Sequence, residues 1–536
     1  MLSDNKLLRK VYTYLRYGAG KELKQTFSKF SNEQYNTVNG EIKYRKILFC
    51  PFTPHRLNIV RESIIAHACR IRGAEVKMLS YDLFLDAIDF MGRKDKKDPG
   101  AIYVINRKVY NIVKLPVVFM SEYYDKDKKY DYDFDKLTVS EIENLTYNGI
   151  YLGDLVIAST VRYFLSNEPE WENPEFIDRA RKFARTAVIL TDVYENLLSE
   201  EKPDKIVASH GIYVSWGTLF RVARSKNIAI DIYGSSYRRN TLRFYHNSPN
   251  APFPEALWPK YKDIPLSQEQ EETVDKYFRS RETQKDDGIS LFDENTNFPD
   301  SLRQFILKAQ NDNKVIFGLF TNIAWDAFMF NSGSAVFDSM IDWLNSTISY
   351  FEENKDSALI IKAHPAEIYH NVPEQYYIRN ILPKNLPDNI YFIDNNENVK
   401  PFDLYPYIDI GLTYLSTVTI EMALMGKTVI TAGDISQYSG KGFTIDPSSR
   451  EEYFEILDRA AKRKLNFIPD VEMAKRYMFY RFFREALVFD YLELKKYQIK
   501  KIKLDSPEDL MPGKDQHLDI ICEGILNDGD FIVNNF

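Results

Sequence analysis

The sequence Lys362-Ala363-His364-Pro365 carries side chains that could bind an anion. It follows the apolar run 358–361, which predicts a buried strand. Proline ends a strand, because it cannot donate a ladder hydrogen bond and it holds the preceding residue extended. The His364 imidazole would then stand at the strand's end and donate to a phosphate or carboxylate, with Lys362 adding positive charge. A strand-ending turn with a satisfied histidine explains the same pattern equally well.

A second candidate is Ser416-Thr417, which precedes an apolar run with helical character. A hydroxyl residue that caps a helix leaves N–H groups at its first turn, and such groups bind anions. We therefore expect Ser416 or Thr417 to hold a phosphate, and Glu421, about one turn further on, to accept hydrogen bonds from ribose hydroxyls. The alternative is an ordinary capped helix in which Glu421 pairs with a nearby cation.

Two other segments of the second half could reach the same ligand. Asn322 and Asp326 are polar residues just beyond the predicted strand 314–320. The glycine-rich segment 431–444 follows another predicted strand, and it either wraps a nucleotide or turns the chain.

The first half offers a separate set of candidates. His55 and Arg56 follow the apolar run 46–50, and His210 and Tyr213 follow the run 205–209. His210 or His55 could act as a base towards a hydroxyl group, or bind an anion. Arg56 could clamp a carboxylate or phosphate, so Arg56, His210 and Tyr213 are the candidates for binding an acceptor. A structural role explains each of them as well.

The elements that position these residues repeat a strand–helix–strand pattern. A strand at 46–50, a helix at 59–72 and a strand at 74–79 form one βαβ unit, the pattern returns at 205–233, and it restarts at 314. This order predicts an α/β fold with two Rossmann-like domains facing across a cleft, followed by C-terminal helices. In such open sheets ligands bind beyond the carboxyl ends of the strands, where the candidate residues lie.

The domain boundaries follow from the same patterns. We expect a helical lead-in at 1–40, a first Rossmann-like domain at 41–285 with an insertion within 90–150, a second at 301–470, and helices with a tail at 471–536. The polar stretch 281–300 would join the two domains. Within the second half we expect helices at 335–354 and 471–496.

Composition and charge narrow the class of protein. The chain has 536 residues, of which 44% are apolar, and a formal net charge of -7, which argues against a general nucleic-acid binder. Its three cysteines, Cys50, Cys69 and Cys522, fit no metal motif and no disulfide framework, which favours a reducing cytoplasm. No Asp-x-Asp metal motif stands at a predicted strand end, so we expect neither a metal nor a cofactor.

No stretch approaches the ~18 apolar residues of a membrane span. Apolar residues at helical spacing in 7–15, flanked by basic residues, fit either a helix lying on an anionic membrane or one packed on the protein body. We expect a cytoplasmic protein, with peripheral association with the inner membrane face as the second interpretation.

Four motifs in the second half carry a family resemblance. In order they are Thr321-Asn322-x-x-Trp325-Asp326, Lys362-x-His364-Pro365, Ser416-Thr417-Val418-x-x-Glu421-x-x-x-x-Gly426-Lys427, and Gly433-x-x-x-x-Tyr438-x-x-x-Gly442-x-Thr444. This order resembles the bacterial capsule polysaccharide biosynthesis family, which includes the Kdo transferases of capsule export systems. The aromatic and basic segment 475–484 resembles that family's last helix, so the match covers about 313–484, and the first half is similar only in layout.

The resemblance implies a GT-B glycosyltransferase fold in which the second domain binds the donor nucleotide, often CMP, and the first binds the acceptor. It implies donor contacts for His364, Pro365, Ser416, Thr417 and Glu421. Two features depart from the family: Thr428 stands where proline is common, and the glutamine that often precedes the Ser-Thr motif is absent. These residues therefore do not fix the donor.

We expect a metal-independent glycosyltransferase that moves a sugar, such as Kdo or another CMP-activated acidic sugar, to a polysaccharide or glycolipid hydroxyl. The expected donor site comprises Lys362, His364, Pro365, Ser416, Thr417, Glu421, Asn322 and Asp326. Teichoic-acid glycerophosphotransferases share the His-Pro and Ser-Thr motifs, so transfer from CDP-glycerol is one alternative. A non-catalytic subunit of a polysaccharide assembly system is another, and a sugar-nucleotide epimerase is a weaker third.

Overall fold

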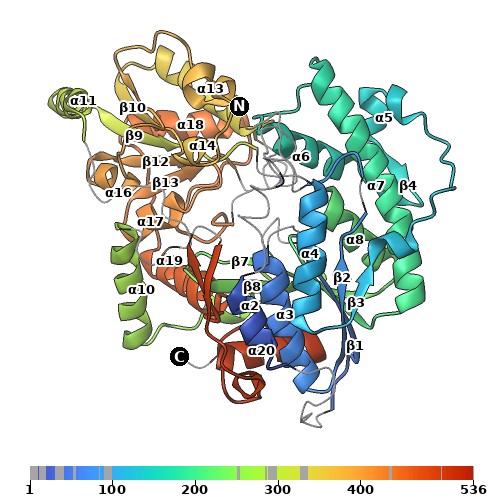
Figure 1. The fold of residues 1–536 in the computed structure, drawn as a ribbon. Helices are drawn as coiled ribbons and strands as arrows, with labels where there is room; N and C mark the ends of the chain where they lie inside the picture. Colours follow the sequence, from blue (N-terminus) through green and yellow to red (C-terminus); the bar gives the residue numbers. More distant parts are fainter. Residues whose placement is uncertain are drawn as a thin grey trace. The chain divides into compact units, whose positions relative to one another are not determined.

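The chain folds into two compact units (Figure 1). Unit 1 contains Met1–Phe164, Pro169–Pro254 and Arg484–Phe536, and unit 2 contains Leu165–Glu168 and Glu255–Phe483. The computed structural model describes residues 10, 20–30, 41–51, 56–83, 85–89, 99–249, 254–283, 287, 298–325, 336–433, 437–495 and 498–534. His55, Asp326 and nearly all of the predicted N-terminal helix lie outside the described residues.

Unit 1 is built on a seven-stranded sheet in the order β14-β8-β7-β6-β1-β2-β3. The five strands from β7 to β3 are parallel, whereas β8 and β14 run antiparallel at one edge. The strands are β1 Lys46–Cys50, β2 Glu75–Ser80, β3 Val117–Phe119, β6 Lys205–Ser209, β7 Ala229–Ser235, β8 Thr241–His246 and β14 Leu487–Val488. Strand addition reverses direction between β1 and β6, which is the topological switch point where such sheets bind ligands.

Helices lie on both faces of this sheet. One face packs on α2 Lys21–Phe27, α3 Arg56–Ile71, α4 Pro99–Val113 and α20 Gln516–Asn527. The other helices are α5 Val139–Glu143, α6 Gly153–Phe164, α7 Pro174–Glu201 and α8 Tyr213–Ser225, with α6, α7 and α8 in mutual contact. Short elements complete the unit: hairpins β4 Thr146–Tyr147 with β5 Ile150–Tyr151 and β15 Leu492–Lys495 with β16 Gln498–Ile502, and 3-10 turns η1 Met120–Tyr123, η2 Phe134–Lys136 and η6 Pro507–Leu510.

Unit 2 is built on a five-stranded, fully parallel sheet in the order β11-β10-β9-β12-β13. The strands are β9 Val315–Phe320, β10 Ser357–Lys362, β11 Ile390–Ile393, β12 Ile410–Thr413 and β13 Thr428–Thr431. Nearly all their residues are buried, as expected for a parallel sheet covered on both faces. The switch point lies between β9 and β12, so the residues that follow these two strands should line the ligand edge.

Separate apolar clusters cover the two faces of the unit 2 sheet. One contains α13 Met340–Glu353 and α18 Arg450–Ala461, and the other contains α11 Asp300–Asn311, α16 Pro401–Leu404 and α17 Val418–Leu424. The remaining elements are α9 Trp258–Tyr261, α10 Gln268–Arg281, α14 Ala366–Tyr369, α15 Ile378–Ile381, α19 Val471–Phe479, the 3-10 turns η3 Glu374–Tyr376 and η4 Tyr405–Tyr407, and a π-helical turn η5 Tyr480–Arg484.

The predicted α/β class with two Rossmann-like domains is confirmed. Each sheet contains five parallel strands which, numbered within the sheet in chain order, lie in the spatial order 3-2-1-4-5. Several local predictions differ from the structure. An insertion was expected within 90–150, and this stretch also supplies two elements of the unit, α4 and the parallel strand β3. The helix expected at 335–354 begins only at Met340, and the helix expected at 471–496 ends at Phe479 and gives way to β14 and β15.

The compact units also differ from the expected boundaries. The main segment of unit 2 begins at Glu255, because α9 and α10 belong to it, and not after 285. The C-terminal residues from Arg484 onward are part of unit 1, because β14 pairs with β8 and α20 packs on α3.

The three cysteines are buried and unbridged. No helix in the described part of the chain has the length and apolar character needed to cross a bilayer.

A buried ion network fastens the C-terminal segment to the unit 1 sheet. Lys205 Nζ lies 3.0 Å from Asp231 Oδ2 and 2.6 Å from Asp528 Oδ1, and the side chains of Lys205 and Asp231 are 0% exposed. His246 places Nδ1 2.7 Å from Asp231 Oδ1 and Nε2 3.0 Å from the Gly529 carbonyl oxygen. Removing one partner of a buried pair is costly, because the other charge is left in a dry environment.

We therefore expect Lys205→Met to lower the free energy of unfolding of unit 1 by about 3–5 kcal/mol. Lys43→Met is the matched control, because Lys43 also pairs with Asp528 but is exposed, and it should change the free energy of unfolding far less. Urea-dependent hydrogen exchange of β6 and β7, followed by mass spectrometry, measures both. Equal effects of the two variants would contradict this role for the buried network.

Candidate functional site

The carboxyl edge of the unit 2 sheet gathers most of the predicted donor-binding residues. His364 follows β10, Asn322 follows β9, and Ser416 and Thr417 follow β12, which are three adjacent parallel strands. Adjacent strands lie about 4.8 Å apart, so these side chains occupy one short stretch of the edge. The structure thus places them together at the switch point of the sheet.

Backbone-to-side-chain hydrogen bonds tie the three strand ends to one another. The amide of His364 donates to Thr321 Oγ1 at 3.0 Å, which joins the ends of β10 and β9. The amide of Leu415 donates to Asn322 Oδ1 at 3.1 Å, which joins the ends of β9 and β12. Asn322 is therefore the central residue of this edge.

The protonation of the His364 ring follows from its contacts. The amide of Ala366 donates to His364 Nδ1 at 3.1 Å, so in the neutral ring the proton must lie on Nε2. Burial, followed by the positive charges of Lys362 and His370, lowers the pKa of His364 to about 4. At pH 7 the ring is neutral, and Nε2–H remains as a hydrogen-bond donor.

Asn322 is oriented in the same sense. Its Oδ1 is occupied by the Leu415 amide, which leaves the Nδ2 amide group as the part of the side chain that could bind a ligand. Among the described residues Nδ2 has no hydrogen-bond acceptor, and the side chain is half-buried. Asn322 therefore offers two N–H donors at the edge and no free acceptor from the same group.

The two hydroxyl residues repeat this arrangement. Ser416 Oγ accepts a hydrogen bond from the Val418 amide at 3.2 Å, and Thr417 Oγ1 accepts one from Arg281 Nη2 at 3.2 Å. Because each oxygen already accepts from the protein, each hydroxyl hydrogen is left to donate. In the described part of the chain neither hydroxyl donates to a protein group.

The four side chains thus form an edge of hydrogen-bond donors, which we call the donor edge: Asn322, His364, Ser416 and Thr417. A ligand bound there must supply acceptors. A fully ionised phosphate group offers acceptors and no donors. Hydrogen bonds to an ionised group are also roughly twice as strong as hydrogen bonds between neutral groups. A hydroxyl-rich group is matched less well, because only the second lone pairs of the Ser416 and Thr417 oxygens remain to accept its hydrogens.

The helix that follows contributes less than the sequence predicted. α17 has only seven residues, Val418–Leu424, and its N-cap Thr417 makes no side-chain capping bond. The Val418 amide is already occupied by Ser416 Oγ. Any anion binding here therefore depends on the side-chain donors more than on the helix terminus.

Glu421 does not face a ligand, contrary to the ribose-binding expectation. It is 3% exposed; Oε1 lies 2.9 Å from Arg281 Nε and 2.7 Å from Nη2, and Oε2 accepts from the Tyr405 hydroxyl at 2.5 Å. Arg281 Nη1 also contacts the Tyr277 hydroxyl at 3.2 Å and Asp287 Oδ1 at 2.9 Å. Glu421 is thus the cation-paired residue of the alternative interpretation, and the pair fixes α10 against α17.

Lys362 is likewise withdrawn from the edge. It is 3% exposed and its Nζ donates to the Ala363 carbonyl at 3.0 Å. Burial lowers its pKa to about 8, against the raising effect of Glu397, Asp394 and Glu367. Lys362 therefore acts on His364 through its charge and does not present its ammonium group to a ligand.

The glycine-rich segment 431–444 closes on a carboxylate of its own loop. Asp446 accepts from Thr431 Oγ1 at 2.8 Å, from the Gly440 amide at 2.8 Å and from Thr444 Oγ1 at 2.9 Å. These bonds are those of a turn, and residues 434–436 lie outside the described residues.

Nowhere in the described residues do three carboxylate, imidazole or thiol side chains come close enough to hold a metal ion.

The candidate acceptor residues of unit 1 are only partly together. His210 and Tyr213 lie in the loop after β6, at the switch point beside β1. Arg56 begins α3, but its Nη2 donates to the Ile499 carbonyl at 3.3 Å, so it is held against β16. Sequence reasoning missed Arg162, whose guanidinium lies 4.9 Å above the Tyr213 ring, because it belongs to α6 and to no local motif.

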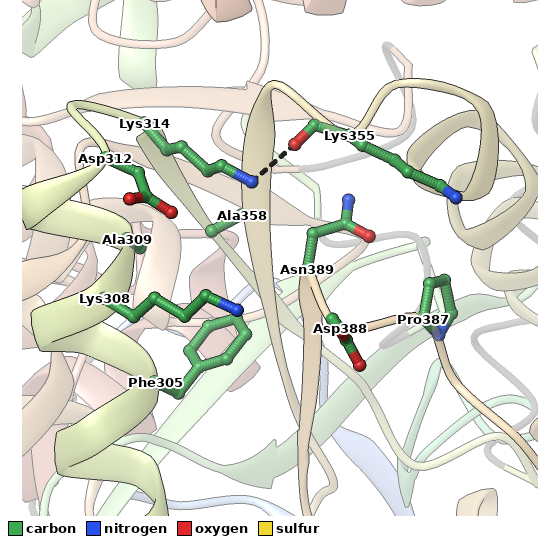
Figure 2. Close-up of a pocket in the computed structure, with 10 residues that line it drawn as sticks. All are labelled: Phe305, Lys308, Ala309, Asp312, Lys314, Lys355, Ala358, Pro387, Asp388 and Asn389. Carbon is green, nitrogen blue, oxygen red and sulfur yellow. Dashed lines mark hydrogen bonds between the residues drawn. The ribbon is translucent and has the colours of Figure 1, made fainter.

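Figure 2 shows a pocket of about 480 Å³ at the opposite, amino-terminal edge of the unit 2 sheet. It lies between α11 and the segments that lead into β9, β10 and β11, and its lining includes Phe305, Lys308, Asp312, Lys314, Asp388 and Asn389. Lys314 Nζ donates to the Lys355 carbonyl at 2.6 Å. None of the predicted donor-binding residues lines it, and open parallel sheets bind ligands at the other edge.

Comparison with known proteins gives remote likenesses. No protein-family model and no curated sequence matches the chain. Among solved structures, the β-Kdo 2,4 transferase KpsC of Thermosulfurimonas dismutans is similar at 14% identity and a TM-score of 0.34, over 51% of this chain and 79% of that one. The UDP-GlcNAc 2-epimerase of Neisseria meningitidis is similar at 10% identity and a TM-score of 0.23, over 81% and 98%.

A glycosyltransferase of Rickettsia africae is similar at 12% identity and a TM-score of 0.24, over 82% of this chain and 93% of that one. Likenesses at this level do not assign an activity.

The state of His364 can be measured directly. We expect its imidazole to titrate with a pKa of about 4 and to carry its proton on Nε2 at pH 7, because burial disfavours the charged ring and the Ala366 amide occupies Nδ1. Since the unfolded value is about 6.5, His364 stabilises the fold fully above that pH, and this contribution is lost as the pH falls from about 6.5 towards 4. Nitrogen-15 NMR of labelled histidine measures both the pKa and the tautomer.

Lys362→Met should raise the pKa of His364, because it removes a positive charge, whereas the change of an exposed lysine such as Lys355→Met should not. A His364 ring with an ordinary pKa, or with its proton on Nδ1, would contradict the orientation described for the donor edge.

Proposed function

We propose that this protein is a glycosyltransferase whose unit 2 binds the phosphate of a nucleotide-sugar donor at the donor edge. The observation that supports it is the uniform direction of the hydrogen bonds: four side chains from three strand ends use their acceptors within the protein and leave donors outward. The motif resemblance supports the same choice, since it implies donor-nucleotide binding for His364, Pro365, Ser416 and Thr417. Pro365 would serve by holding the His364 turn.

The same donors would assist the chemical step. When the bond from the sugar to the phosphate breaks, negative charge develops on the leaving phosphate. Fixed hydrogen-bond donors stabilise that charge without having to reorient. Because His364 is neutral, it would stabilise the phosphate by its Nε2–H bond and would not need to lose a proton at pH 7.

Unit 1 would bind the acceptor, a polysaccharide or glycolipid hydroxyl. His210 is the candidate base, because it lies at the switch point of its sheet, and burial, followed by the charges of Arg162 and Arg243, lowers its pKa to about 4. A neutral imidazole can accept the proton of an attacking hydroxyl group. We propose Kdo or another CMP-activated acidic sugar as the transferred group, on the resemblance alone.

The donor edge fits one other class of reaction equally well. A glycerophosphotransferase that uses CDP-glycerol would also need donors aimed at a diphosphate, and nothing at this edge recognises the sugar itself. Transfer assays with labelled CMP-sugars, UDP-sugars and CDP-glycerol separate the two. Product from a nucleotide sugar supports the glycosyltransferase, and product from CDP-glycerol alone would replace it with the phosphotransferase.

The donor edge is tested most sharply by Asn322→Asp. The new carboxylate still accepts from the Leu415 amide, but it replaces outward donors with a negative charge. We expect nucleotide affinity to fall by about 100-fold or more, because a hydrogen bond to a charged group contributes about 1.5–3 kcal/mol and each 1.4 kcal/mol is about tenfold in Kd. Isothermal titration calorimetry with CMP, CDP and UDP measures it.

Asn313→Asp is the matched control, because Asn313 precedes the same strand β9 and is exposed, so the same charge is added at the opposite edge of the sheet. It should leave nucleotide affinity unchanged. Equal affinity of the two variants would remove Asn322 from the site. Failure of the native protein to bind any of the three nucleotides would favour a non-catalytic subunit instead.

A further inference from the structure

The loop after β6 in unit 1 has an unusual backbone. His210, Gly211 and Tyr213 have φ values of 62°, 70° and 66°, which lie in the left-handed region. For a residue other than glycine this conformation is strained, and such residues concentrate where the fold holds a side chain for function. Two of the three here are a histidine and a tyrosine at the switch point of the sheet.

The surrounding structure holds this loop in place. The amide of Val214 donates to Ser159 Oγ at 2.8 Å, and the amide of Ser215 donates to Asp89 Oδ2 at 2.6 Å. These bonds satisfy the first turn of α8 from within the protein, so the helix terminus is not open to a ligand. What the loop presents is the His210 side chain.

The Nδ1 atom of His210 is buried and has no hydrogen-bond partner among the described residues. The imidazole ring packs on Trp216, with ring centroids 5.2 Å apart. A buried polar atom without a partner normally costs free energy, so such atoms require an explanation. A ligand that contacts the imidazole would supply one.

Arg162 lies over the ring of Tyr213, three residues after His210, and has unused donors among the described residues. Its Nη1 donates to the Asp89 carbonyl at 2.7 Å, and its guanidinium lies 4.9 Å over the Tyr213 ring. An arginine has five N–H donors, and this is the one hydrogen bond that Arg162 makes within the described residues. Stacking on Tyr213 fixes the plane of the guanidinium, which suits it to a carboxylate or phosphate.

Arg243 adds a second positive charge on the same face of the sheet. It pairs with Gly234 across β8 and β7, one residue beyond the Tyr233–Phe244 pair, so its side chain is on the face opposite to theirs. Ile232 shares that face with Arg243, and a Cβ at Gly211 would lie 3.4 Å from Ile232 Cδ1. The loop after β6 therefore lies on the Arg243 face.

The charges around His210 are thus mainly positive. Arg162 reaches it from α6 and Arg243 from β8, and both lower its pKa after the larger effect of burial. The nearby carboxylate, Asp89, is bonded through Oδ2 to the α8 amide. The buried Glu62 carboxylate is bonded to the Tyr233 hydroxyl on the other face of the sheet.

We propose that His210, Arg162 and Arg243 form an oxyanion-binding site at the switch point of unit 1, and that the acceptor carries a carboxylate or phosphate group that binds there. That the anion belongs to the acceptor rests on the proposed function, whereas the binding of an anion does not. Binding would offset the two positive charges, so that His210 becomes a stronger base when the acceptor is present.

Histidine NMR on the full-length chain tests this site and the donor edge separately. The chain has seven histidines, and His210 reports on unit 1 while His364 reports on unit 2. Addition of inorganic phosphate in one arm, and of glucuronate in the other, should raise the pKa of His210 from about 4 by at least about one unit, because an adjacent opposite charge favours the protonated ring. A response in one arm alone identifies the phosphate or the carboxylate as the ligand.

Arg162→Gln should abolish the response of His210, and Arg162→Lys, which keeps the charge without the planar fork, should retain part of it. Arg224→Gln is the control, because Arg224 is exposed near the far end of α8. If Arg162→Gln fails to fold, the lysine variant carries the test.

The inference is overturned if neither anion moves the His210 pKa, or if Arg162→Gln and Arg162→Lys respond as the native protein does. A response of His210 without any response of His364 to phosphate or to CMP would leave the unit 1 site standing and contradict the donor edge instead.

Discussion

The hydrogen bond from the Leu415 amide to Asn322 Oδ1 sets the character of the unit 2 edge. A side-chain amide can present either its oxygen or its nitrogen to a ligand, and this bond leaves the nitrogen outward. The Ala366 amide makes the same choice for the His364 ring by occupying Nδ1. Two backbone N–H groups thus leave hydrogen-bond donors as the free groups of two side chains that could otherwise present either a donor or an acceptor.

This arrangement depends on packing further from the edge. The ends of β10, β9 and β12 are adjacent because the sheet reverses its order of strand addition at β9. Thr417 keeps its orientation because Arg281 donates to its hydroxyl oxygen, and Arg281 is in turn fixed by the buried Glu421 carboxylate. A buried charge pair of this kind resists separation, since either partner alone would remain desolvated.

The two proposed anion sites differ in the charge of the groups that form them. The edge of unit 2 presents neutral donors, whereas the loop after β6 in unit 1 lies between the charges of Arg162 and Arg243. Neutral donors can stabilise a charge that grows during a reaction, and fixed cations suit an anionic group that is present throughout. This difference fits a leaving phosphate in unit 2 and a permanently charged acceptor in unit 1.

Much of the fold could be predicted from the sequence, because buried parallel strands have continuous apolar sequences. The same runs place Asn322, His364 and Ser416 correctly at strand ends, since the residue after a strand is a local property. Side-chain partners that are distant in sequence could not be predicted. Glu421 looked available for ribose until the fold brought Arg281 to it from 140 positions away.

The burial of Lys362 and the strand at Leu487–Val488 also could not be predicted, because both depend on residues that are distant in the sequence. Lys362 reads as an exposed cation next to His364, yet the fold buries it against the Ala363 carbonyl. The aromatic stretch after Val471 has helical periodicity, but Leu487–Val488 forms a strand because it pairs with β8 at the edge of the unit 1 sheet. Arg162 belongs to no sequence motif. It became a candidate binding residue only when the structure placed its guanidinium over the Tyr213 ring.

A crystal structure of the full chain with CMP would show whether the carboxyl edge of the unit 2 sheet binds a phosphate. We expect phosphate oxygens within hydrogen-bonding distance of His364 Nε2 and Asn322 Nδ2, with the Asn322–Leu415 bond intact. A phosphate bound instead in the pocket that contains Lys308 and Lys314, or one that accepts from neither His364 nor Asn322, would contradict it.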